Sequence, residues 1–137
     1  MTPTACACTK LRRSARAVTA MYDAAIVSTG LTTPQFALLR MLDRAGACSL
    51  SALAVQTGHD RTSISRMVTG LVQRGLITFA PGKDQRERIV ATTAAGLAAL
   101  ASARHGWEVA EARIDAALGA DRAVLFALLD RIEAMAA

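Results

Sequence analysis

The sequence lacks the features of membrane, secreted and disulfide-stabilised proteins. No uncharged stretch among its 137 residues is apolar enough for a membrane span, which needs about 20 residues. The N-terminus has no apolar signal core and soon reaches the basic run KLRRSAR, so we do not expect secretion. The three cysteines, Cys6, Cys8 and Cys48, are too few and odd in number for a disulfide framework. We therefore expect a cytoplasmic protein.

Residues that commonly carry catalysis are also scarce. His59 and His105 are the only histidines, and neither stands in a nucleophile or metal-ligand pattern. No glycine-rich phosphate loop occurs, because GLVQRG belongs to a helix and its end. We predict that the protein is not an enzyme and has no cofactor and no resident metal.

Apolar residues and positive charge are abundant instead. The hydrophobic fraction is 53%, which in a chain of single-domain length suits an obligate oligomer. Residues 1–30 carry four basic and one acidic side chain, residues 31–92 carry eight and four, and residues 93–137 carry four and six. A basic front and middle with an acidic tail indicates a polyanionic partner for part of the molecule. A solvated surface with uneven charge is the alternative.

The first half of the chain reads as four helices. A stripe of apolar residues spaced by three and four predicts a helix from Cys8 to about Ser28. Thr33 as N-cap, with Pro34 in the first position, starts a second helix that ends at a left-handed Gly46. The third is a short helix capped by Ser51, with Leu50 packed on Val55 and a stop at Gly58. The fourth is capped by Asp60 and ends near Arg74 and Gly75, so residues 51–75 read as a helix-turn-helix.

A change of periodicity follows Gly75. LITFA and RIVAT are rich in β-branched residues and flank the polar loop PGKDQRE, so they predict a two-stranded hairpin. A long helix then runs from Thr93 to about Leu118, and a last helix follows Asp121 with an apolar stripe. The predicted fold is mainly α with a small β-hairpin wing (α+β), a winged helix-turn-helix between terminal helices.

The fourth helix has one apolar and one polar side. On a helical wheel of about 100° per residue, Met67, Val68 and Leu71 cluster near Ile64. Hydroxyl groups and a guanidinium lie away from this cluster, on Thr62, Ser63, Ser65, Arg66 and Thr69. Short hydroxyls and arginine suit the DNA major groove, where they meet phosphates or base edges. An ordinary surface helix is the alternative, but the preceding short helix and turn favour a recognition helix.

The hairpin tip supplies a second basic element. Lys83, Arg86 and Arg88 lie at or beside it, where a wing can follow the DNA backbone and insert an arginine into the minor groove. Asp84 can hold the guanidinium of Arg86 in place. A solvated charged loop is the alternative for Lys83 and Glu87.

The chain resembles the MarR family of winged-helix transcriptional regulators. GLTTPQFALLRML is similar to that family's second helix, SLSALAVQTGHDRTSISRMVTGLVQRGLI to its helix-turn-helix, and KDQRERIVATTAAG to its D-x-R wing with a following T-x-x-G. The resemblance covers nearly the whole chain, as a single domain over residues 1–137. It implies that residues 1–30 and 93–137 form dimerisation helices and that residues 31–92 form the winged helix-turn-helix.

The resemblance also implies a function and a set of site residues. Family members are homodimers that bind double-stranded DNA with a (pseudo)palindromic operator, and they commonly act as repressors. The recognition-helix positions correspond to Thr62, Ser63, Ser65 and Arg66, and the wing arginine to Arg86 with Asp84 as its partner. A winged helix that binds an acidic protein, without specific DNA readout, is the alternative function.

Release from DNA by a small phenolic or lipophilic effector, or by cysteine oxidation, is a further implication. We expect an effector pocket between the first helix, the second helix and the start of the fifth, lined by Tyr22, Phe36 and Trp107, although these residues also suit a plain core. Cys6, near Lys10, is a candidate for oxidation. Cys8 is a second candidate, but its place on the apolar stripe favours a packed, reduced thiol. Metal binding by the Cys-x-Cys pair is a weaker option because no histidine is near.

Overall fold

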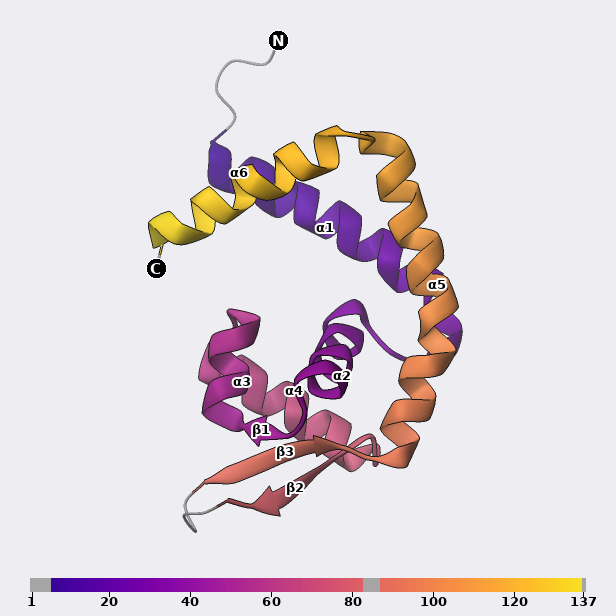
Figure 1. Cartoon of the computed structure of the whole chain (residues 1–137), viewed down its shortest axis with the longest axis vertical. Coiled ribbons are helices and arrows are strands. Elements are labelled where there is room, and N and C mark those ends of the chain that lie inside the picture. The colour runs from indigo at the N-terminus through magenta and orange to yellow at the C-terminus, as the bar shows by residue number, and fades with distance from the viewer. Residues whose placement is uncertain (1–5, 83–86, 137) are drawn as a thin grey trace.

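A long helix joins two groups of elements in the computed structural model, which describes residues 6–82 and 87–136 (Figure 1). The chain begins with α1 (Ala7–Ala25) and the short 3₁₀ helix η1 (Val27–Thr29). The central group is α2 (Thr33–Ala45), β1 (Cys48–Ser49), α3 (Leu50–Thr57), α4 (Arg61–Gln73), β2 (Ile77–Pro81) and β3 (Arg88–Thr92). The long helix α5 (Ala94–Leu118) and the last helix α6 (Asp121–Ala136) follow. The predicted winged-helix class is confirmed.

The wing is part of a three-stranded antiparallel sheet in the order β1-β3-β2. The predicted hairpin is present, and its register pairs Ile77 with Thr92 and Pro81 with Arg88. The sequence prediction missed β1, in which Cys48 pairs with Val90. A strand of two residues has no periodicity to detect, but it ties the start of α3 to the wing.

Two predicted helix starts were wrong by one or two residues. The cap of α2 is Thr32, not Thr33, because Thr32 and Gln35 form a reciprocal capping box. Thr33 instead donates its amide and its hydroxyl to Asp23 of α1, both at 2.6 Å, and so ties α1 to α2. Gly46 ends α2 as predicted, but with φ 82° and ψ −176° it is not in the left-handed helical conformation.

The cap of α3 is Ser49, not Ser51. The Ser49 hydroxyl accepts a hydrogen bond from the Ala52 amide at 3.1 Å, since β1 delivers this residue in an extended conformation. The predicted packing of Leu50 on Val55 is wrong, because Leu50 lies within the helix and Val55 is 82% exposed. Gly58 (φ 70°) ends α3, and Asp60 caps α4 by accepting from the Ser63 amide at 2.6 Å, both as predicted.

The hydrophobic core lies between the helices and the sheet of the central group. Its large, fully buried side chains are Leu38, Leu39, Leu53, Ile64, Val68, Leu71, Ile77 and Val90. These come from α2, α3, α4 and the two wing strands, so this part of the chain has an interior of its own. The outward face of α4 is therefore held on a rigid support.

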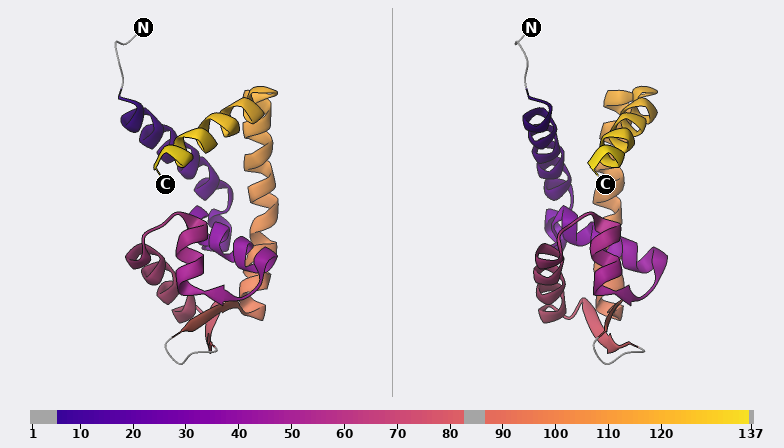
Figure 2. Two further views of the ribbon diagram at one scale, coloured as in Figure 1. Left: turned by 60° about the vertical axis from the view of Figure 1, so that its left-hand side comes forward. Right: turned by 90° about the vertical axis from the view of Figure 1, so that its left-hand side faces the viewer.

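The terminal helices form the other end of the molecule. The α1 and α5 backbones meet closely, since a Cβ on Gly106 would lie 2.1 Å from the Ala25 carbonyl oxygen. Helix α6 turns back from the end of α5 and buries no residue. It overlaps α1 in Figure 1, but the right-hand view of Figure 2 separates the two helices. No described helix has the length and apolarity that a membrane crossing requires.

Candidate nucleic-acid interface

The two sides of α4 are separated as the helical wheel predicts. Ile64, Val68 and Leu71 are buried in the core. The predicted DNA-facing side chains lie on the opposite side, where Ser65 is half-buried and the exposed residues are Thr62, Ser63, Arg66 and Thr69. The buried side fixes the orientation of the helix, so the hydroxyls and the guanidinium point to solvent.

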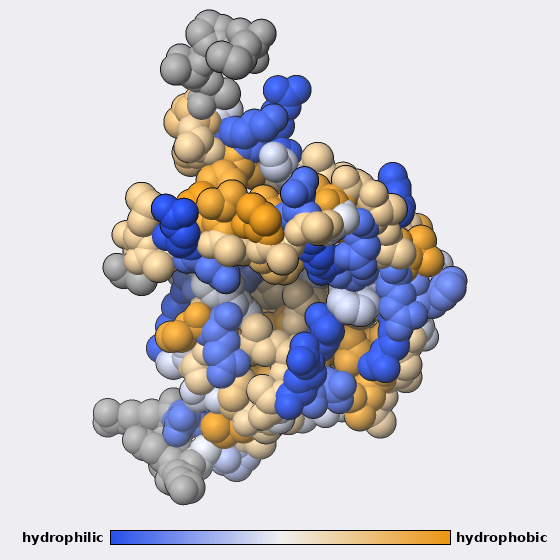
Figure 3. Space-filling view, turned by 45° about the horizontal axis from the view of Figure 1, so that its top comes forward, coloured by the Kyte–Doolittle hydropathy of each residue, from blue (hydrophilic) through white to orange (hydrophobic). Residues whose placement is uncertain are grey.

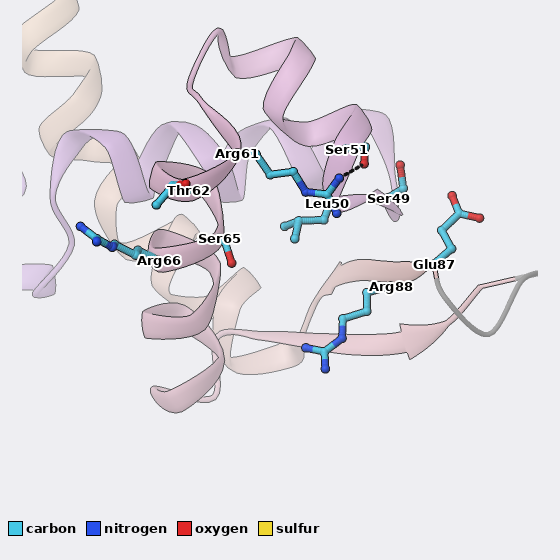
Figure 4. A pocket seen from close by; sticks show the side chains of 9 residues that line it. All are labelled: Ser49, Leu50, Ser51, Arg61, Thr62, Ser65, Arg66, Glu87 and Arg88. Atoms are coloured by element: carbon cyan, nitrogen blue, oxygen red, sulfur yellow. Dashed lines mark hydrogen bonds between the residues drawn. The ribbon is translucent and has the colours of Figure 1, made fainter.

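A basic groove of about 870 Å³ runs beside this helix (Figure 4). It is lined by Ser49, Leu50, Ser51, Arg61, Thr62, Ser65, Arg66, Glu87 and Arg88. Four of the predicted DNA-binding residues, on α4 and on β3, therefore line one surface, whereas Ser63 and Thr69 lie outside the groove lining.

Ser49, Ser51, Arg61 and Glu87 also line the groove, although their sequence pattern did not predict a place in it. The two serines were missed because Ser51, and not Ser49, was predicted to cap α3. Arg61 could have been found from its position four residues before Ser65, which places both on one flank of α4.

Arg88 is fixed at the wing side of the groove. Its guanidinium carbon lies 4.9 Å from the ring centroid of Phe79 on the neighbouring strand, a cation–π contact. The other predicted wing residues, Lys83, Asp84 and Arg86, lie outside the described residues. Arg88 is therefore the wing cation whose place the structure gives.

The charges of this region are open to solvent. The ion pairs among the described residues involve Arg122 of α6, so Arg61, Arg66 and Arg88 have no carboxylate partner there. Hydrogen bonds from the Ser63 hydroxyl and amide lower the pKa of Asp60, which keeps this helix cap ionised. Three arginines against one lining carboxylate, Glu87, give the groove a positive charge suited to a polyanion.

Tyr22, Phe36 and Trp107 are brought together, as predicted, in a separate pocket of about 400 Å³. The Phe36 and Trp107 ring centroids are 6.0 Å apart, and the Arg40 guanidinium carbon lies 4.2 Å from the Trp107 centroid. The predicted position on α5 was wrong, because Trp107 lies in the middle of that helix and not at its start. Phe36 is also a buried member of the core.

Tyr22 links this pocket to the last two helices. Its hydroxyl donates to Glu111 Oε1 at 2.6 Å, and Arg122 of α6 binds Glu111 Oε2 at 2.6 Å and Asp115 at 2.7 Å. Burial, and then the hydrogen bond to the Glu111 carboxylate, raise the pKa of Tyr22 to about 12. The pocket rim and the start of α6 are therefore joined by one chain of polar contacts.

The cysteines differ in part from the sequence expectation. Cys6 and Cys8 are both exposed, so Cys8 is not packed within the single chain. The pKa of Cys6 is lowered by hydrogen bonds from Thr9 and Cys8, with the Thr9 amide contributing most, and not by Lys10. Among the described residues, no group of three or more histidine, cysteine, aspartate or glutamate side chains is placed to hold a metal.

Comparisons with known proteins agree with this geometry. A model of the MarR family matches residues 29–87. The Mycobacterium tuberculosis transcriptional regulator MosR, solved in complex with DNA, is 32% identical, with a TM-score of 0.84 over 96% of this chain and 98% of that one. No curated protein matches significantly.

Two further solved structures are similar over most of their length. The transcriptional regulator PcaV from Streptomyces coelicolor, solved with its natural ligand, is 25% identical with a TM-score of 0.87, covering 96% of this chain and 94% of that one. The transcriptional repressor CouR, bound to a 23-mer DNA duplex, is 27% identical with a TM-score of 0.84, covering 93% and 92%. All three are named as regulators of transcription rather than as enzymes. The chain belongs to the MarR family of transcriptional regulators.

Proposed function

We propose that this protein is a homodimeric repressor that binds a (pseudo)palindromic DNA operator and is released by a small molecule or an oxidant. The observation that carries the proposal is the polar face of α4, which opens onto a basic groove beside the wing. The rival function, an acidic-protein binding module, is not favoured, because MosR and CouR were solved with DNA.

Exposed apolar side chains on the terminal helices support the dimer. Helix α6 exposes Val124, Leu125, Leu128 and Ile132 on one stripe, and α1 exposes Val18. Figure 3 shows hydrophobic residues gathered in the upper part of the view. Such a patch on a small chain is typical of a protein–protein interface. Residues 1–30 and 93–137 would then hold two copies of residues 31–92 at a fixed separation.

DNA contacts follow from this arrangement. Two recognition helices about 34 Å apart reach successive major grooves on one face of the duplex. We assign Thr62, Ser63, Ser65, Arg66 and Thr69 to that contact. The wing residues Lys83, Arg86 and Arg88 are assigned to the flanking backbone or minor groove, with Asp84 as the partner that holds the Arg86 guanidinium in place.

The effector pocket is proposed at Tyr22, Phe36 and Trp107, with Arg40 beside the tryptophan ring. A phenolic or lipophilic compound would pack on these rings, and PcaV is an example of a relative with a natural ligand. Such a compound releases DNA only if it binds more tightly to a dimer with misplaced recognition helices, since the coupling is reciprocal. Oxidation of Cys6 or Cys8 is the second proposed signal.

The DNA function is tested by selecting bound sequences from random duplex with the purified full chain. We expect a two-fold symmetric site, and footprinting should show two protected half-sites. Arg66→Gln should relax base preference by about 1–3 kcal/mol at one position of each half-site. A protein that selects no sequence at low ionic strength would contradict the proposal.

The two signals are tested separately. Aromatic acids and quinone-like compounds should raise the melting temperature and weaken operator binding, and a library without either effect removes the ligand proposal. Replacing Cys6 and Cys8 together by serine should abolish any response to peroxide. An unchanged peroxide response in that variant removes the redox proposal.

A further inference from the structure

Arg61 occupies an unusual place at the start of α4. The first turn of this helix contains no acidic residue, and Arg61 puts a positive charge at the end where the helix dipole is already positive. The acidic side chain that stabilises this end is the cap Asp60, so Arg61 adds nothing favourable through the helix dipole. The position therefore suits a residue whose charge is used by a partner with negative charge.

The side chain is also oriented. Arg61 Nη1 donates to the Ser51 hydroxyl at 3.0 Å, across the turn between α3 and α4 (Figure 4). One of its five N–H donors is used in this contact, and no described carboxylate pairs with it. The guanidinium is thus held at the α3 side of the basic groove with its charge unneutralised.

Its direction differs from that of Arg66. At about 100° per residue, Arg61 and Ser65 share one flank of α4, whereas Arg66 lies about 140° further round, near the centre of the exposed face. A side chain at the centre of a recognition helix contacts base edges, and a side chain on the flank contacts the sugar–phosphate backbone beside the DNA major groove. Arg88 lies on the opposite, wing side of the protein's basic groove.

We infer that Arg61, oriented by the Ser51 hydroxyl, binds a DNA phosphate at the α3 side of the groove, and that it fixes the position of α4 without reading a base. This inference rests on the proposed DNA-binding function and adds two residues to it. Arg61 makes the contact, and Ser51 is a positioning residue that acts through Arg61.

The test compares Arg61→Gln with the wild-type full chain on the selected operator and on a scrambled duplex, at about 50–200 mM salt. Loss of one phosphate contact in each protomer should weaken binding of the dimer to both duplexes about a hundredfold, roughly tenfold per contact. It should also reduce the slope of log affinity against log salt by about 1.8, or about 0.9 per contact, and leave base preference unchanged. Arg44→Gln is the matched control, because it removes one exposed arginine of α2 that lies outside the groove and outside the proposed dimerisation helices, and it should change neither quantity.

Two further variants separate charge from orientation. Arg61→Lys should keep the salt slope and recover part of the affinity, because it retains the charge. Ser51→Ala should keep the slope and lose less affinity than Arg61→Gln, because the guanidinium remains but is no longer held. Both variants remain informative if Arg61→Gln does not fold.

The outcomes are distinguishable. A wild-type chain that binds no duplex overturns both the proposed function and this inference. A wild type that binds DNA, with Arg61→Gln indistinguishable from Arg44→Gln, overturns the inference alone, as does a change of base preference in Arg61→Gln. Wild-type affinity in Ser51→Ala overturns the positioning role of Ser51.

Discussion

The winged helix-turn-helix and the terminal helices differ in how well the single chain covers their apolar side chains. In the winged helix-turn-helix, apolar side chains are covered: every large side chain that is fully buried lies between residues 31 and 92. At the terminal helices fewer apolar side chains are covered: α6 buries none, α1 buries only Tyr22, and α5 buries Leu100, Ala103 and Ala110.

The ion pairs that the structure gives lie at one end only. At the terminal helices, Arg122 pairs with both Glu111 and Asp115, and these are the ion pairs among the described residues. In the groove, Arg61, Arg66 and Arg88 have no such partner. The exposed apolar stripe of α6 therefore suits an apolar partner, and the arginines of the groove suit an anionic one, as in a DNA-binding dimer.

The largest expected effect lies in the covered interior. Replacing Leu39, which is fully buried in α2, by alanine should lower the free energy of unfolding by about 2–5 kcal/mol, because the removed side chain leaves a cavity. Chemical denaturation measures this loss. A loss below about 1 kcal/mol would mean that the interior of the winged helix is not tightly packed.

The uncovered stripe should respond differently. Leu128→Asp places a charge on the apolar stripe of α6 and should weaken the dimer by about 1.5–3 kcal/mol or more, the value of burying a leucine. Ala134→Asp adds the same charge to the opposite side of α6 and serves as the control. Sedimentation at several protein concentrations measures both. Equal behaviour of the two variants would contradict dimerisation through this stripe.

A pair of identical substitutions tests how the two ends are joined. Gly106→Ala should destabilise the protein by about 1–3 kcal/mol, because the new Cβ would lie 2.1 Å from the Ala25 carbonyl oxygen where α5 crosses α1. Gly70→Ala in α4 meets nothing within 4 Å and should stabilise by about 0.5–1 kcal/mol, the helix preference for alanine. Thermal melts measure the sign of the stability change in each variant. A stabilising or neutral effect of Gly106→Ala would show that the α1–α5 contact is not a tight one.

The sequence predicted most where periodicity carries the information. The polar and apolar sides of α4, the wing strands and the start of α5 after Thr93 all follow from spacing. Helix caps were harder, since Thr32 and Thr33, or Ser49 and Ser51, are chemically equivalent until the tertiary structure assigns their partners. The bond between Arg61 and Ser51 could not be predicted, because it depends on how the α3–α4 turn brings residues ten positions apart together.

The smallest expected effect at neutral pH concerns Tyr22, at the terminal end. Its pKa is raised to about 12 from 10.0, so the folded state favours the neutral phenol. The resulting stability is complete below about pH 10 and is lost as the pH rises through 12. Because Tyr22 is the only tyrosine, tyrosinate absorbance reports it directly. A midpoint near 10 in the folded protein would contradict the contact with Glu111.

Glu111→Gln separates the two causes of this shift. The amide oxygen still accepts the Tyr22 hydrogen bond, but the negative charge that opposes a phenolate is gone, so the midpoint should fall below that of the wild type. It should stay above 10, because burial, the largest cause, remains. The start of α4 responds to pH in the opposite direction, because hydrogen bonds from Ser63 lower the pKa of Asp60 in the folded protein. The stability that Asp60 contributes is complete above its pKa in the unfolded chain. It is lost as the pH falls through its lower pKa in the folded protein. Alkali should therefore remove the stabilisation that Tyr22 gives the terminal helices, and acid should remove the one that Asp60 gives the start of α4.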